Sequence, residues 1–135
     1  MNNIMKSKLI FFTALAVFLL NFVSCKKPAG EGGRAFINGK VYVKNYNAAF
    51  TAISSEYYGQ GENVYITYGD NTVVGNNTKT SYDGSYEFPY LRKGKYKIFV
   101  VSKDLTSSAT ISVIKEVEIT ERKQVINLPD LVIIK

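Results

Sequence analysis

The sequence predicts an all-β protein whose main body is a single β-sandwich of about seven strands. Two observations predict this class. From residue 34 onward, short segments alternate apolar and polar side chains, which is the pattern of half-buried strands. Only residues 47–58 have a spacing that is compatible with one or two helical turns. Turn-forming residues fill the gaps between the expected strands, at 69–71, 75–77, 83–84 and 92–94.

Five expected strands follow one another, at residues 35–43, 63–69, 84–91, 95–102 and 109–120. Successive side chains of a strand point to opposite faces, so every second residue of each strand is expected in the core. These inward positions are Ala35, Ile37, Gly39, Val41, Val43, Val64, Ile66, Tyr68, Tyr86, Phe88, Tyr96, Ile98, Val100, Ile111, Val113, Val117 and Ile119.

The last two expected strands each contain an irregularity. Lys115 is expected to face solvent, which predicts a phase slip or bulge between Val113 and Val117. The final strand lies within residues 124–135. Pro129 interrupts it and implies a sheet edge or a bulge, because proline has no N–H to donate to a neighbouring strand.

A more specific pattern lies in residues 78–101, "TKTSYDGSYEFPYLRKGKYKIFVV". Asp83 and Gly84 favour a tight turn, because glycine accepts a positive φ without steric cost. Together with residues 36–43 and 61–68, this stretch resembles the carboxypeptidase regulatory-like domains. The resemblance implies a transthyretin-like Greek-key sandwich. The residues expected to serve structure, in turns or in the core, are Gly39, Asp83, Gly84, Tyr86, Phe88, Gly94 and Tyr96.

Residues 1–24 have the layout of a cleaved signal peptide. Lys6 and Lys8 precede an apolar run at residues 9–20, which is shorter than the roughly 20 residues that a membrane-spanning helix needs. The stretch "FVSC" at 22–25 resembles a bacterial lipobox with Phe in place of the usual Leu. The resemblance implies that Cys25 becomes the first mature residue and carries acyl chains such as palmitate. The alternatives are an ordinary cleaved leader or an uncleaved anchor with an inert thiol.

The remaining chain is expected to have two parts. Residues 25–33 are rich in Gly and Pro and are expected to form a lipidated flexible tether, and residues 34–135 are expected to form the sandwich. Lys26 follows the acylated position and favours the bacterial outer membrane over retention at the inner membrane. Whether the domain would face the periplasm or the cell surface stays open.

The residue types argue against several kinds of chemistry. The chain has no histidine and one cysteine, so Ser-His-Asp and Cys-His nucleophiles and the usual zinc and iron ligand sets are absent. We expect no enzyme activity, no cofactor and no metal. The basic residues are scattered, with the densest group at 92–97, so no nucleic-acid partner is expected. The oxygen-bearing residues Asp70, Asn71, Asn76 and Asn77 are interpreted as polar turns.

The expected function is that of a non-catalytic cell-envelope lipoprotein, a binding or assembly module for a protein or glycan partner. The candidate binding surface lies in the connection 44–62, because aromatic side chains exposed on loops can anchor a partner. It consists of Tyr46, Phe50, Tyr57 and Tyr58. The same residues could instead cover an open edge of the sandwich. One alternative function is a structural subunit of a surface polymer with pilin-like strand exchange, since Arg34 precedes the first strand, and an unrecognised enzyme is the third.

Overall fold

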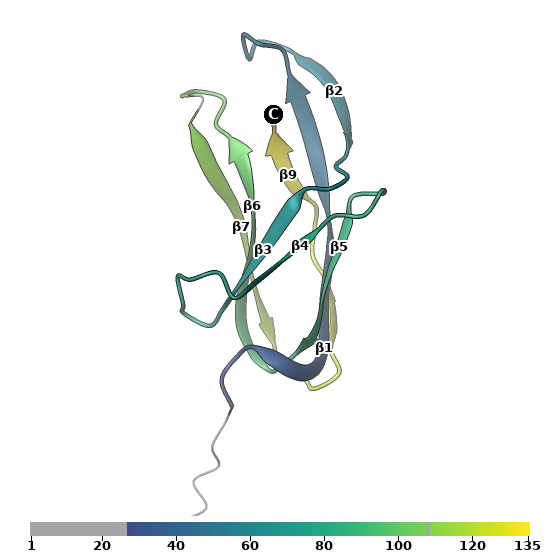
Figure 1. Ribbon diagram of the computed structural model, residues 1–135, viewed down its shortest axis with the longest axis vertical. Helices are drawn as coiled ribbons and strands as arrows, with labels where there is room; N and C mark the ends of the chain where they lie inside the picture. The colour runs from purple at the N-terminus through teal and green to yellow at the C-terminus, as the bar shows by residue number, and fades with distance from the viewer. Residues whose placement is uncertain (1–26, 108) are drawn as a thin grey trace, which may run out of the picture.

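The computed structural model describes residues 27–107 and 109–135, and these residues form nine strands in two sheets (Figure 1). This confirms the all-β sandwich class, with nine strands in place of about seven. Residues 1–24, which are expected to form a signal peptide, and Cys25 lie outside the described residues. Within the described part, no helix is long and apolar enough to cross a membrane. The strands are β1 (Glu31–Tyr46), β2 (Ile53–Tyr58), β3 (Asn63–Tyr68), β4 (Asn76–Lys79), β5 (Ser85–Leu91), β6 (Gly94–Lys103), β7 (Thr110–Ile119), β8 (Val125–Asn127) and β9 (Leu131–Ile134).

Strand β1 is the centre of the five-stranded sheet. One of its edges pairs antiparallel with β5 and then, further along, with β2. Its other edge pairs in parallel with β8 and then with β9. The single C-terminal strand expected from the sequence is in fact two short strands, β8 and β9. Pro129 lies in the connection between them, where its missing N–H removes no hydrogen bond from a strand pair.

The second sheet has the order β4-β3-β6-β7 and is antiparallel throughout. The register between β6 and β7 is continuous from the pair Gly94–Ile119 to the pair Lys103–Thr110, so the expected bulge near Lys115 is wrong. Lys115 lies on the same face as Val113 and Val117 and is half-buried, because its aliphatic stem can lie along apolar neighbours. Ile111 was expected in the core, but it is exposed and lies beside the turn that connects β6 to β7.

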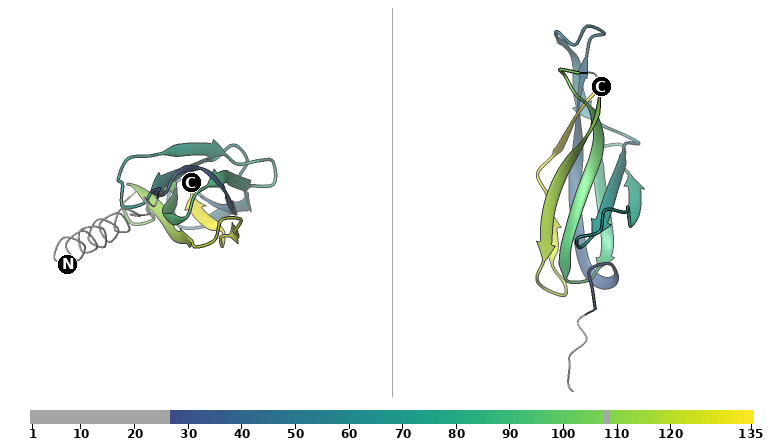
Figure 2. Two further views of the ribbon diagram at one scale, coloured as in Figure 1. Left: turned by 90° about the horizontal axis from the view of Figure 1, so that it is seen from below. Right: turned by 90° about the vertical axis from the view of Figure 1, so that its left-hand side faces the viewer.

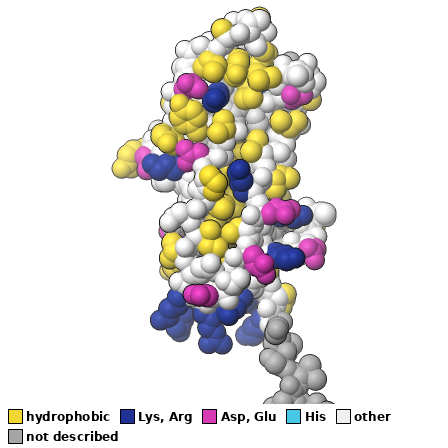
Figure 3. Space-filling model, turned by 180° about the vertical axis from the view of Figure 1, so that it is seen from behind, with side chains coloured by type: hydrophobic (Ala, Val, Ile, Leu, Met, Phe, Trp, Pro, Cys, Tyr) yellow, Lys and Arg dark blue, Asp and Glu magenta, His cyan; other side chains and the backbone are white. Residues whose placement is uncertain are grey.

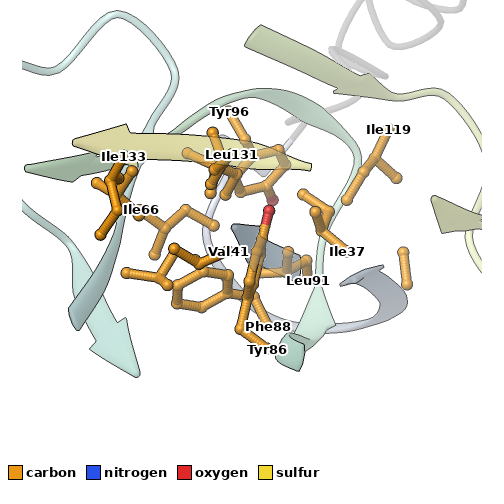
Figure 4. Packing of buried hydrophobic residues seen from close by; sticks show 14 of the residues in the cluster. Ile37, Val41, Ile66, Tyr86, Phe88, Leu91, Tyr96, Ile119, Leu131 and Ile133 are labelled. Carbon is orange, nitrogen blue, oxygen red and sulfur yellow. The ribbon is translucent and has the colours of Figure 1, made fainter. Parts of the chain in front are cut away.

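The core fills the space between the two sheets, which face each other as layers in Figure 2. The predicted inward residues of β1, β5 and β6 are buried there except Gly39, which is half-buried, and Figure 4 shows Tyr86, Phe88 and Tyr96 packed among the aliphatic side chains. Tyr68 is partly buried and packs against the cluster, with its ring 5.9 Å from that of Tyr96. The core residues are Ala35, Ile37, Val41, Val43, Val64, Ile66, Tyr86, Phe88, Leu91, Tyr96, Ile98, Val100, Ile119, Leu131 and Ile133.

The N-terminal segment joins the domain earlier in the chain than the sequence suggests. Strand β1 begins at Glu31, so residues 31–33, expected in the tether, belong to the first strand. Gly30 is buried, and its carbonyl accepts a 2.8 Å hydrogen bond from the backbone N–H of Arg92. The Arg92 side chain also donates to the carbonyl of Pro28 at 2.9 Å. The described chain is therefore held to the β5–β6 turn from Pro28 onward.

The segment 47–58 forms a turn and strand β2, and it does not form the one or two helical turns with which its spacing is compatible. It folds back as β2 on the far half of β1, with Tyr42 opposite Tyr58 and Lys44 opposite Glu56. The side chain of Asn47 stabilises the turn between β1 and β2, since its Oδ1 accepts a 2.9 Å hydrogen bond from the N–H of Thr51. Asparagine commonly stabilises turns in this way. The hairpin projects at the upper end of the molecule in Figure 1.

Candidate functional site

The structure separates the four aromatic residues of the predicted binding surface. Tyr46 and Phe50 stack at the tip of the β1–β2 hairpin, with ring centroids 6.3 Å apart, and the Nζ of Lys103 lies 5.7 Å from the Phe50 ring. Tyr57 and Tyr58 are neighbours in a strand, so their side chains point to opposite faces of the sheet. Both are about equally exposed, at 42% and 43%. The four residues therefore do not form one surface.

Tyr58 is held in place by three neighbours on the outer face of the β1 sheet. Its ring meets that of Tyr42 edge-on at 5.2 Å, and the Nζ of Lys40 lies 4.8 Å from its centroid. Its hydroxyl donates a 3.1 Å hydrogen bond to Oδ2 of Asp130. That hydrogen bond to a carboxylate raises the pKa of Tyr58. The ring is thus oriented before any partner arrives, while much of its surface stays open.

A polar groove adjoins Tyr58, because Lys40 and Asp130 belong to both. Its volume is about 640 Å³, which is in the range of small-molecule sites. It is lined by Asn38, Gly39, Lys40, Thr78, Lys79, Ser81, Ser85, Tyr86, Glu87, Asn127, Leu128 and Asp130. We use the name "Tyr58 face" for the outward-pointing residues of this region. They are Asn38, Lys40, Tyr42, Tyr58, Glu87, Asn127 and Asp130.

The topology explains why these residues meet. Asn38 of β1 lies opposite Glu87 of β5 on one side and opposite Asn127 of β8 on the other. With its amide nitrogen turned toward Glu87, Asn38 donates to that carboxylate at 3.1 Å. Three strands that are far apart in the sequence therefore place amide and carboxylate groups side by side. The amides both donate and accept hydrogen bonds and the carboxylates accept them, which suits a ligand rich in hydroxyl groups.

Tyr86 is one of the residues that line the groove, and its hydroxyl is buried. This oxygen has no hydrogen-bond partner among the described residues, which is uncommon for a buried polar atom. It lies so close to Gly39 that a Cβ at that position would overlap it. Burial raises the pKa of Tyr86, and the negative charge of Asp130 raises it further. Because Gly39 has no side chain, there is room for the Tyr86 hydroxyl at this position.

The structure places Asp83 and Gly84 in the turn between β4 and β5. Asp83 Oδ1 accepts hydrogen bonds from the Ser85 hydroxyl at 2.6 Å and from its N–H at 3.2 Å. Gly84 has a φ of 77°, and its carbonyl accepts from the N–H of Val41 at 2.9 Å. Lys40 forms an ion pair with Asp83 at 3.3 Å. The turn therefore fixes the lysine that lies over Tyr58.

The other expected structural residues lie near the start of the chain. Gly94 begins β6 with a φ of 142°, and a Cβ there would meet Ala29 at 2.7 Å. The hydroxyl of Tyr96 donates to the carbonyl of Arg92 at 2.6 Å. In the described residues, no three His, Cys, Asp or Glu side chains are grouped so that they could hold a metal ion. Asn76 and Asn77, which were expected in a polar turn, lie instead in β4, and Asn76 donates to Glu31 at 2.6 Å.

Sequence reasoning missed most of the Tyr58 face. Asn38, Glu87, Asn127 and Asp130 look like ordinary solvent-facing strand residues, and only the pairing of three strands brings them together. The one signal in the sequence is alternation, since Asn38, Glu87 and Asn127 each follow an apolar residue that is buried or partly buried. This alternation indicates that the three side chains face outward, but it does not indicate that they form a binding site.

Comparison with known proteins adds little. No protein-family model matches this chain, and no curated protein sequence matches it significantly. A crystal structure from Pseudomonas aeruginosa, described as a "putative carbohydrate binding protein", is similar to 79% of this chain and 92% of its own. The two share 15% sequence identity, with a TM-score of 0.45. A similarity of this size assigns neither a family nor a function to this chain.

Proposed function

We propose that this protein is a non-catalytic lipoprotein of a bacterial outer membrane whose sandwich binds a glycan through the Tyr58 face. One observation carries the binding proposal. Tyr58 is fixed by Asp130 and Lys40 beside a groove of amides and carboxylates, yet 43% of its surface is exposed. Pre-orientation of this kind reduces the entropy that a binding partner must remove.

A glycan fits this combination of groups. The apolar face of a sugar ring can stack on a tyrosine ring, and the tyrosine keeps a polar end in water. The sugar hydroxyls can donate to Glu87 and both donate to and accept from Asn127. Small-ligand sites use aromatic side chains for contact and polar groups to fix the orientation of the ligand, and Tyr58 and its polar neighbours supply both kinds of group. A protein partner, the other expectation from the sequence, would require a wider contact than this groove supplies.

The test is direct binding of the purified chain to polysaccharide fractions from a bacterial envelope, with a matched pair of asparagine variants. Asn127→Ala removes an exposed amide from the Tyr58 face, and Asn71→Ala removes an exposed amide from the β3–β4 connection, which does not line the groove. One lost hydrogen bond should weaken binding roughly threefold to tenfold for Asn127→Ala. Equal affinities of the two variants, or no saturable binding to any fraction, would contradict the proposal.

Lipid attachment at Cys25 is the second part of the proposal. It is supported by the signal-peptide layout of residues 1–24 and by the lipobox-like stretch that ends at Cys25. Cys25→Ser should abolish incorporation of a fatty-acid analogue during growth, whereas Ser24→Ala keeps a small residue before the cysteine and should retain it. Labelling that persists in Cys25→Ser would show that the thiol is not the attachment site.

The transthyretin-like, carboxypeptidase regulatory-like assignment is part of the same proposal. Its support is the Asp-Gly, aromatic-x-aromatic and Gly-x-Tyr skeleton of residues 78–101. The strand-exchange alternative gains no support from the fold. Arg34 lies inside β1, and β1 is paired along both edges beyond that point. Cleavage at Arg34 would leave most of the strand in the sheet.

A further inference from the structure

Basic side chains gather at the end of the sandwich where the described chain begins (Figure 3). Two turns meet at this end, because Gly94 after the β5–β6 turn pairs with Ile119 before the β7–β8 turn. The start of β1 lies beside them, with Ala35 paired to Leu91. We call this set the "basic end". It consists of Arg34, Arg92, Lys93, Lys95, Arg122 and Lys123.

The cations of the basic end outnumber the carboxylates that lie beside them. Of the ion pairs within the described residues, none includes a member of the basic end. Those pairs use Lys40, Lys44, Lys97 and Lys135, which lie elsewhere in the fold. Three carboxylates share this region: Glu31, Glu118 and Glu121. Glu31 accepts hydrogen bonds from Tyr68 and Asn76, and Glu118 lies opposite Lys95. The basic end therefore retains a net positive charge.

The chain holds the basic end close to Cys25. Arg92 binds the carbonyl of Pro28, so three peptide units separate Cys25 from the first residue that the domain fixes. Three extended residues span at most about 11 Å. The Debye length at 0.1 M ionic strength is about 10 Å. If Cys25 is acylated, the exposed cations beside Pro28 lie within the electrostatic reach of the membrane surface.

We infer that the basic end docks on the anionic phosphate headgroups of the membrane that holds Cys25, and this inference rests on the proposed lipid attachment. An acyl anchor combined with a basic patch is a recognised two-signal mode of membrane binding. Docking would orient the long axis of the sandwich roughly perpendicular to the plane of the membrane. The β1–β2 hairpin lies at the opposite end and would point away from the lipid (Figure 1).

The test places one fluorophore at either end of the acylated protein in vesicles whose headgroups carry a quencher. The acylated Cys25 leaves no other thiol, so Val125→Cys labels the basic end and Ala48→Cys labels the hairpin. Both positions are exposed. With phosphatidylglycerol present, quenching should be strong at residue 125 and weak at residue 48. Raising the ionic strength from about 0.1 M to about 1 M shortens the Debye length to about 3 Å and should release residue 125.

A matched pair of charge variants tests the surface itself. Arg122→Gln with Lys123→Gln should lower the ratio of docked to undocked protein roughly 30-fold, whereas Lys79→Gln with Lys103→Gln should change it little. Equal quenching at residues 125 and 48, or equal effects of the two variants, overturns the docking inference. Failure to join phosphatidylcholine vesicles at all indicates instead that the acyl anchor is missing, and the inference then falls together with the lipid attachment.

Discussion

The backbone N–H of Gly30 donates a 2.9 Å hydrogen bond to the hydroxyl of Tyr96, which is 66 residues away in the sequence. The same hydroxyl donates to the carbonyl of Arg92 at 2.6 Å. Burial raises the pKa of Tyr96, so the hydroxyl is protonated at neutral pH and able to donate. One core side chain thus connects the N-terminal segment to the turn that carries part of the basic end.

Two truncations of Tyr96 should separate packing from hydrogen bonding. Tyr96→Ala removes a buried ring and should lower the free energy of unfolding by about 3–5 kcal/mol. Tyr96→Phe keeps the ring but leaves the N–H of buried Gly30 without its partner, which should cost about 1–3 kcal/mol. Denaturant unfolding measures both. A Tyr96→Phe variant as stable as the parent would mean that Gly30 is not held by this hydroxyl.

Asp83 should make the stability of the domain depend on pH in the acid range. Hydrogen bonds from the Ser85 hydroxyl and N–H, followed by Lys40, lower the pKa of Asp83 from 3.8 to about 2. The unfolded chain therefore binds this proton more readily than the folded protein does. The stabilisation is present above about pH 4 and is lost as the pH falls toward 2.

Asp83→Asn keeps an acceptor for Ser85 but removes the charge. The difference in unfolding free energy between the parent and this variant should therefore shrink as the pH falls from 4 to 2. Thermal unfolding at several pH values in this window is the measurement. A difference that stays constant across the window would show that the Asp83 carboxylate contributes nothing to stability.

Tyr86→Phe should not destabilise the domain. The hydroxyl it removes is buried and has no partner among the described residues, so its desolvation is not offset by a hydrogen bond. The variant should be equal in stability to the parent or gain up to about 1 kcal/mol. Phe88→Leu in the same strand serves as a control that must lose stability. A clear loss in Tyr86→Phe would reveal that its hydroxyl is hydrogen-bonded in solution.

The sequence was most informative where one face of a strand is apolar and the other polar. In β1, β5 and β6 this contrast predicts most of the buried residues, because a shift of one position would expose the entire apolar set. The exceptions are Gly39, which is half-buried, and Leu91, which is buried out of phase with Phe88. The contrast fails in β2, whose six residues are all exposed, so no alternation could mark it. It is also misleading at Lys115, where a long side chain occupies an inward position.

The candidate site was less predictable than the fold. Tyr58 could be singled out as an aromatic residue in a connection, but its orientation depends on the register with Tyr42 and on a hydrogen bond to Asp130. The parallel pairing of β8 and β9 with β1 brings Asn127 and Asp130 into position. Strand pairing between distant segments of three or four residues leaves no periodic trace in the sequence.

The central claim is that a glycan binds the Tyr58 face, and adjacent residues of β2 provide its most direct test. Tyr57 and Tyr58 are equally exposed tyrosines on opposite faces of one strand, so each is the matched control of the other. The measurement is the dissociation constant of Tyr57→Ala and of Tyr58→Ala for the same bound polysaccharide, with melting temperatures recorded for both. Loss of the stacking ring should weaken binding at least about tenfold in Tyr58→Ala, while Tyr57→Ala stays within about twofold of the parent. Equal losses at unchanged stability, or a larger loss in Tyr57→Ala, would contradict the account.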